Sequence, residues 1–267
     1  MINNTIRISI LTILFAGVIS LGAVFLLKTV YAHTFSGSES AAFLALVKIL
    51  QADLHLVQSN IASNVTLAQA HANAVAEHLD ANTTKELAER NKLVANELTK
   101  ATADLNQTVI TKPIPTQELV KGNVDRTDAL LQEAITVRVE KNELNNSTVK
   151  GQAIGDIVDE ALERYRKAYG IEEGNSAAGG GNTIVNMADY QSAQAIVTKA
   201  QEMFNEAKQI VPANASASSP STLAVITKLG SNLAMLKNDI DTKVPYDKVA
   251  TFVNSTITPD LKSAFKF

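Results

Sequence analysis

Apolar residues recur at spacings of three and four along most of this chain, which places their side chains on one face of an α-helix. Five such stripes run through Phe43, Val47, Leu50, Leu54, Val57 and Ile61; Leu87, Val94, Leu98, Ala101 and Leu105; Ile154, Ile157, Val158, Ala161, Tyr165 and Ala168; Tyr190, Ala193, Val197, Ala200, Phe204, Ala207 and Val211; and Ile226, Leu229, Leu233, Leu236 and Ile240. No segment sustains the alternation typical of a strand. The pattern predicts an all-α fold, an antiparallel multi-helix bundle.

Helix boundaries are predicted by capping residues and by prolines. Thr83 is followed three positions later by Glu86, which is the spacing of a reciprocal N-terminal cap. Pro113 and Pro115 exclude a helix between them, and Thr116 then caps the next one.

Two glycine-rich or small-residue breaks interrupt the second half of the chain. One runs from Gly170 to Asn182 and contains Gly179-Gly180-Gly181, and the other runs from Pro212 to Ser221. They predict two helical lobes, residues 38–170 and 183–267. The sequence does not show whether the two lobes pack as one body.

The N-terminal 32 residues have the layout of a secretory leader. Arg7 precedes 20 uncharged, mostly apolar residues from Ile8 to Leu27, and Val30-Tyr31-Ala32 supplies small residues at positions −3 and −1 of a cleavage site. The apolar run is long for a signal peptide and long enough to span a bilayer. Residues 1–32 are therefore a signal peptide or a membrane anchor. In both cases residues 33–267 are expected outside the cytoplasm, with membrane contact through residues 8–27 if the leader is uncleaved.

The composition of the chain argues against several classes of function. Without the leader, 22 basic and 27 acidic residues leave a formal charge of −5, and the densest basic run is Arg164-Tyr165-Arg166-Lys167, so nucleic-acid binding is not expected. The chain has no cysteine, which excludes disulfides and thiolate chemistry. It has no Trp and only 5% aromatic residues, so an aromatic-lined ligand cleft is not expected either.

The four histidines are the candidate metal ligands: His33, His55, His71 and His78. Cleavage after Ala32 would make His33 the first residue, and its amine and imidazole could then chelate copper together, with another imidazole completing the site. His71 and His78 are two helical turns apart, and a turn near Ser63 could bring His55 toward His71. The alternative is that all four are ordinary histidines on amphipathic helices.

Asparagine in the Asn-x-Ser/Thr motif recurs near predicted helix junctions, where a glycan has room. These residues are candidate glycosylation sites, although Asn is also a common capping residue. They are Asn64, Asn82, Asn106, Asn145, Asn146, Asn214 and Asn254.

No catalytic motif emerges from the chain. Gly179-Gly180-Gly181 lacks the Lys and Ser/Thr of a phosphate loop, and Ala76-Glu77-His78 lacks the second histidine of a zinc protease helix. Glu160, Glu163, Glu172 and Glu173 have no accompanying Glu-x-x-His pair, so a solvated helix face is the expected role. The chain is predicted to be non-catalytic and to need no cofactor, with copper as the alternative.

Two segments resemble known families. Ala68-Gln69-Ala70-His71-Ala72-Asn73, together with Thr84-Lys85-Glu86-Leu87-Ala88-Glu89-Arg90-Asn91, resembles exported all-helical proteins of unassigned function from ammonia-oxidising archaea. Ile184-Val185-Asn186-Met187-Ala188-Asp189-Tyr190, with Ala193 and Val197, is similar to the extracytoplasmic helical domain of bacterial iron permeases. The permease membrane helices with their paired glutamates are missing. The second resemblance therefore implies an extracytoplasmic bundle and leaves iron handling unsupported.

These observations favour an exported, non-catalytic helical bundle that acts as a binding or scaffolding module at the cell surface, with a protein partner. The first alternative is a copper-binding protein that uses His33. The second is the ectodomain of a sensor, but residues 261–267 form neither a membrane span nor a signalling domain, so its signal would have to pass through a partner.

Overall fold

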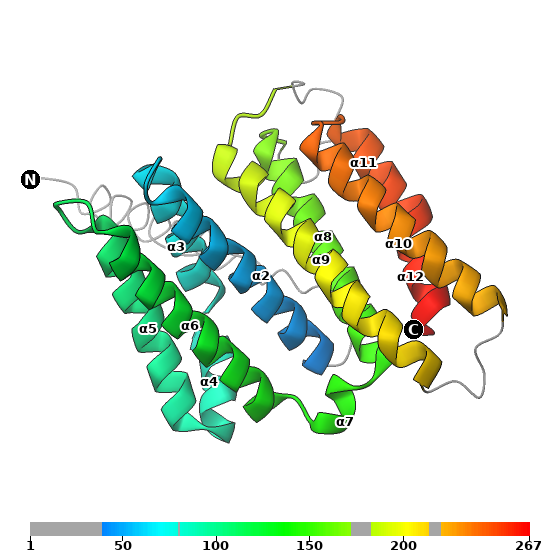
Figure 1. Ribbon diagram of the computed structural model, residues 1–267, viewed down its shortest axis with the longest axis horizontal. Helices are drawn as coiled ribbons and strands as arrows, with labels where there is room; N and C mark the ends of the chain where they lie inside the picture. Colours follow the sequence, from blue (N-terminus) through cyan, green and yellow to red (C-terminus); the bar gives the residue numbers. More distant parts are fainter. Residues whose placement is uncertain (1–38, 80, 172–182, 214–219) are drawn as a thin grey trace, which may run out of the picture. The chain divides into compact units, whose positions relative to one another are not determined.

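The computed structural model describes residues 39–79, 81–171, 183–213 and 220–267. These residues belong to one compact unit, Gly37–Phe267. The part described contains helices and no strand (Figure 1), so the all-α prediction is confirmed. The elements are α2 (Glu39–Asn60), α3 (Val65–His78), α4 (Ala81–Arg90), α5 (Lys92–Ile110), α6 (Gln117–Arg138), α7 (Lys141–Leu144), α8 (Ser147–Ala168), α9 (Met187–Ala213), α10 (Pro220–Asp241), α11 (Tyr246–Phe252), the π-helix η2 (Val253–Ile257) and α12 (Thr258–Phe265). The predicted leader, residues 1–32, lies outside the described residues.

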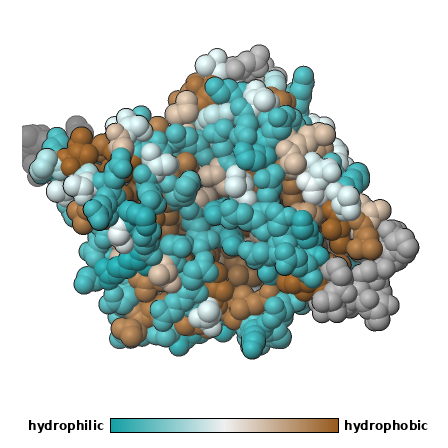
Figure 2. All heavy atoms as spheres, viewed as in Figure 1, coloured by the Kyte–Doolittle hydropathy of each residue, from teal (hydrophilic) through white to brown (hydrophobic). Residues whose placement is uncertain are grey.

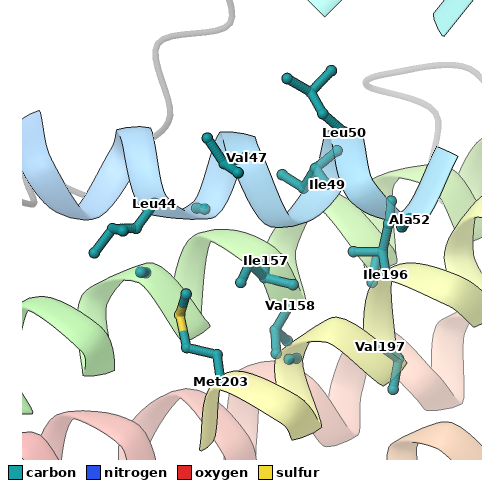
Figure 3. Packing of buried hydrophobic residues seen from close by; sticks show 14 of the residues in the cluster. Leu44, Val47, Ile49, Leu50, Ala52, Ile157, Val158, Ile196, Val197 and Met203 are labelled. Carbon is teal, nitrogen blue, oxygen red and sulfur yellow. The ribbon is translucent and has the colours of Figure 1, made fainter. Parts of the chain in front are cut away.

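Helix α2 is the central helix of the unit and packs against α3, α6, α8 and α9. Leu50 points away from α8 and α9, whereas Ala52 lies near Ile196 of α9 (Figure 3), and all three side chains are buried. Both faces of α2 are therefore buried, as expected of a helix that is apolar around most of its circumference.

Among the described residues, α2 is also the one helix whose length and apolar composition would suffice to cross a membrane. Most of that apolar stretch is buried inside the unit. Burial by neighbouring helices accounts for this composition, because a core helix needs the same apolar surface as a membrane span.

Helices α8 and α9 form the most extensive contact between helices in the unit. The chain segments predicted as two lobes, 38–170 and 183–267, therefore meet along this contact and form one compact unit. The predicted boundary is a connection between two packed helices. A glycine-rich segment ends a helix, but the helices before and after it still have apolar faces. These faces are buried when the two helices pack against each other.

The predicted break at Gly170 has a defined backbone structure. Gly170 adopts a left-handed φ of 66°, which a residue with a Cβ disfavours. The N–H of Gly170 donates to the carbonyl of Lys167 at 2.9 Å, and that of Ile171 donates to Arg166 at 3.3 Å. This pattern is the Schellman motif, which satisfies the last carbonyl groups of α8.

All residues of the five predicted stripes are buried except Val211, which is half-buried. Thr116 caps α6 as predicted, because its side chain accepts from the N–H of Leu119. The cap predicted at Thr83 is wrong, since α4 begins at Ala81 and Thr83 lies in its first turn. The second stripe also crosses a helix boundary at Asn91, whose side chain caps α5.

The residues after Lys243 form helices that the stripes did not predict. Among their buried side chains, Val249, Val253, Ile257 and Leu261 follow a spacing of four, which exceeds the 3.6 residues of an α-helical turn. The π-helix η2 widens the turn, with the N–H of Thr258 bonded to the carbonyl of Val253. Pro259 explains its position, because a proline clashes with the carbonyl four residues earlier in a regular helix. The wider turn keeps all four side chains facing the core.

Tyrosine hydroxyls attach this C-terminal part to the rest of the unit. Tyr165 of α8 donates to the carbonyl of Val244 at 2.6 Å, and Tyr190 of α9 donates to that of Ile240 at 3.0 Å. The connection after α10 is thereby bonded to α8, and the last turn of α10 is bonded to α9. The face of the molecule seen in Figure 2 is mostly hydrophilic, with smaller hydrophobic patches between the polar side chains.

Candidate functional site

A cluster of polar side chains is buried where α2, α3 and α9 meet. We call Asp53, Asn60, His71, Gln191 and Ser192 the buried polar cluster. Asp53, His71 and Ser192 are only 0%, 1% and 2% exposed. The Nδ1 atom of His71 lies 3.0 Å from Oδ1 of Asp53, and Ser192 donates to the same oxygen at 2.7 Å. Side chains of α3 and of the distant α9 therefore both contact one carboxylate of α2.

Hydrogen bonds determine how the amides of the buried polar cluster are oriented. Asn60 Nδ2 lies 2.9 Å from the carbonyl of Leu56, which can only accept, so this atom is the amide nitrogen. It also donates to Oε1 of Gln191 at 3.0 Å, while Nε2 of Gln191 donates back to Asn60 at 3.3 Å. The oxygen of Gln191 therefore faces Nε2 of His71, at 3.1 Å. Nε2 of His71 must carry a hydrogen.

The pair between His71 and Asp53 also requires a proton in a defined place. With Nε2 protonated, a hydrogen bond between Nδ1 and the carboxyl group needs one further proton, either on the ring or on Asp53. The pair thus holds this proton between two groups that have almost no access to water. Oδ2 of Asp53 has no hydrogen-bond partner among the described residues. A buried pair of this kind contributes little net stability to the fold, because desolvation offsets much of the attraction.

A second polar group, centred on Arg164 of α8, lies beside this cluster. Its guanidinium donates to Glu160 at 2.7 Å and to Asp189 of α9 at 3.1 Å. Its third contact is Nε2 of His78, the last residue of α3, at 2.6 Å. Arginine can only donate, so Nε2 of His78 must present its lone pair.

Burial and the charge of Arg164 lower the pKa of His78, against the opposing influence of Glu160 and Asp53. His78 therefore needs to be neutral in this geometry. The positive charges of the basic run, residues 164–167, are paired with acidic side chains. Arg164 is paired with Glu160 and Asp189, Arg166 is paired with Glu163, and the Tyr165 side chain between them is buried.

Serine, histidine and aspartate do not form a nucleophilic triad in the buried polar cluster. In that arrangement the serine hydroxyl donates to a ring nitrogen of histidine, and the aspartate holds the other nitrogen. Here Ser192 donates to Asp53, on the same side of the ring as the Nδ1 contact, and Gln191 occupies Nε2. Ser192 is also buried, so a substrate carbonyl has no approach to its hydroxyl.

Gln191 belongs to the buried polar cluster and also lines a surface groove of about 540 Å³ between α2, α9 and α10. Small and apolar side chains, amides and charged groups all line this groove. The lining residues are Ala52, His55, Leu56, Gln191, Gln194, Ala195, Thr198, Lys199, Glu202, Lys237 and Asp241.

The charges of the groove form pairs along its helices. Lys199 lies 2.8 Å from Glu202 on α9, and Lys237 lies 2.5 Å from Asp241 on α10. Gln194 also donates to Asp241 at 2.9 Å, which joins the two helices. The groove is thus a polar, charge-balanced surface over a floor that includes Ala52 and Ala195.

The described histidines lie in three different surroundings. His55 is exposed in the groove, His71 is buried against Asp53, and His78 contacts Arg164. The turn after α2 does bring α3 back onto α2, but Asp53, not His55, is the residue that meets His71. In the described ranges no group of three or more His, Asp or Glu side chains could hold a metal ion. His33 lies outside them.

The candidate glycosylation sites differ in their surroundings. Asn64 and Asn146 are exposed, and their side chains cap α3 and α8. Asn145 is exposed after α7, Asn254 is exposed within η2, and Asn106 is half-buried inside α5. Asn82 lies in α4. Asn214 is outside the described residues.

Sequence reasoning did not identify Asp53, Ser192, Gln191 and Arg164 as members of a site. The available signal was a charged residue within an apolar run, since Asp53 interrupts the stripe between Leu50 and Leu54. A charge at such a position is buried only with a partner.

Comparison of the chain with protein-family models, with curated proteins and with solved structures finds no match.

Proposed function

We propose that this protein is an exported, non-catalytic antiparallel helical bundle that acts as a binding or scaffolding module, and that the groove between α2, α9 and α10 is its binding surface. The observation that carries the proposal is the groove itself, a volume of about 540 Å³ lined by both apolar and hydrogen-bonding groups. Pockets of this size are typical of binding sites for small ligands.

The buried polar cluster supports this function because it fixes the orientation of a side chain in the groove. Gln191 lies in the groove and is held by His71 and Asn60, so its side chain has one orientation. Binding surfaces that are ordered before contact lose less entropy on association. The arrangement of Ser192 and Asp53 offers support to the groove and no nucleophile.

Export is part of the proposal and rests on the predicted leader. Exposed motif asparagines such as Asn64, Asn145 and Asn254 would then be accessible for glycosylation. Mass spectrometry of the native protein tests both points, since it reports the mature N-terminus and any glycan mass. A retained Met1 in soluble material from the cytoplasm would contradict export.

The binding surface can be tested by blocking the groove. Ala195→Arg places a long side chain on its floor, and Ala129→Arg makes the same change at an exposed position of α6 outside the groove. We expect a partner that co-purifies from native membranes with the tagged wild-type chain and with Ala129→Arg, but not with Ala195→Arg. Equal recovery of every partner by both variants, or no partner above an untagged control, would contradict the proposal.

A further inference from the structure

The two histidines of α3 have opposite hydrogen-bonding requirements. His71 must carry a hydrogen on Nε2, because that atom faces the oxygen of Gln191 at 3.1 Å. His78 must carry none on Nε2, because that atom accepts from Arg164 at 2.6 Å. One is buried beside a carboxylate, whereas the other lies at the end of the helix beside a permanent cation.

We propose that His78 forms an acid-sensitive contact, which holds the C-terminal end of α3 against α8 while its ring is neutral and releases it when the ring is protonated. Protonation adds a hydrogen to Nε2 and removes the acceptor that Arg164 uses. It also places two cations face to face. Arg164 cannot withdraw readily, since Glu160 and Asp189 hold its other N–H groups at 2.7 and 3.1 Å.

Other charges around His78 act in both directions. Glu160 and Asp53 favour the protonated ring, whereas Arg164 and Lys167 oppose it. Glu160 lies 3.9 Å from Nε2 of His78, but its Oε1 already accepts from Arg164. Burial and Arg164 prevail, so the pKa of His78 in the closed contact is below the ordinary value of 6.5.

The direction of the pH response follows from this lowered pKa. Because the open state binds the proton more tightly, acidification through and below pH 6.5 favours opening. Each unit by which the pKa of the closed state lies below that of the open state raises the opening constant about tenfold at full protonation. The response should be local, because α3 ends at His78 and its other turns are anchored by His71 and by apolar contacts.

Nitrogen NMR of the full chain with ¹⁵N-labelled histidine tests the closed state directly. At pH 7.5 we expect a neutral His78 ring with the hydrogen on Nδ1, and a His71 ring with a hydrogen on Nε2. Lowering the pH to 5 should increase the protonated fraction of His78. A His78 ring that carries a hydrogen on Nε2 at pH 7.5 would overturn the proposal, whatever the variants show.

Hydrogen–deuterium exchange then tests the release. After correction for intrinsic exchange, we expect peptides that cover the end of α3 to exchange faster at pH 5 than at pH 7.5 in the wild type. His78→Gln keeps an acceptor for Arg164 without a titrating group and should show no such change. His78→Lys should show fast exchange at both pH values.

His55→Gln is the matched control, because His55 is an exposed histidine on another helix. It should retain the wild-type response. An acid response in His78→Gln equal to that of the wild type, or its loss in His55→Gln, would overturn the assignment to His78.

Discussion

Replacement of Asp156 by Asn should stabilise the protein above neutral pH. Asp156 lies on α8, is 2% exposed, and its Oδ1 atom has no hydrogen-bond partner among the described residues. Burial, and secondarily the charge of Asp159, raise the pKa of Asp156 to about 7. Burial raises that of Asp159 to about 6, although Lys262 opposes the shift. The folded state therefore holds a proton on Asp156 that the unfolded chain has already lost near neutral pH.

The magnitude follows from the pKa difference between folded and unfolded states. A change from 3.8 to about 7 corresponds to about 4 kcal/mol at 1.36 kcal/mol per unit. A raised pKa makes this contribution fully present below pH 3.8, and it is lost as the pH rises through about 7. Asn keeps the shape and carries no charge, but its amide needs hydrogen-bond partners. We therefore expect Asp156→Asn to gain about 2–4 kcal/mol at pH 8 and almost nothing at pH 4.

Urea unfolding followed by far-ultraviolet circular dichroism at several pH values measures this difference. A gain of that size corresponds to an increase in Tm of roughly 4–16 °C for a unit of this length. Asp125→Asn is the control, because Asp125 is an exposed carboxylate, and it should leave the pH dependence unchanged. The reasoning is refuted if Asp156→Asn is no more stable than the wild type at pH 8, or if both lose stability equally between pH 5 and pH 8.

Three further substitutions test individual contacts by urea unfolding. Gly151→Ala would place a Cβ atom 2.5 Å from Cγ of Phe265, so α8 and α12 must separate at a cost of about 1–3 kcal/mol; unchanged stability would show that the approach is not tight. Thr116→Ala removes the acceptor that caps α6 and should cost about 1 kcal/mol, whereas Thr116→Ser should restore most of it. Tyr165→Phe deletes the donor to the Val244 carbonyl and should cost about 1–2 kcal/mol. It should also speed amide exchange in the connection after α10, and unaltered exchange there would contradict this role.

Much of the helical content could be predicted because it depends on local periodicity. The stripe from Phe43 to Ile61 lies on one face of a single helix, and every member is buried. Local signals failed where two consecutive helices share one stripe, as at Asn91, where the apolar spacing continues although the helix ends. They also failed after Lys243, because a spacing of four with an internal Pro259 does not match a regular α-helix.

The candidate site could be predicted only in part. The histidines were predicted as candidate metal ligands, and among the described residues no group of three or more His, Asp or Glu side chains could hold a metal ion. Their partners could not be found, because Asp53 and Ser192 are 139 positions apart and Arg164 and His78 are 86 positions apart. Spacing along a helix carries no information about which distant helix will face a given side chain.

The sequence by itself determined that the chain is helical, where some of its helices begin or end, and which side of five segments is apolar, because these properties follow from interactions between residues a few positions apart. Tertiary structure decided that the two predicted lobes are one unit, since α8 and α9 bury their apolar faces against each other. It also decided the chemistry of α3, where His71 meets a carboxylate and His78 meets a guanidinium. Two residues of the same type on one helix thereby acquire opposite protonation requirements, which only their surroundings can impose.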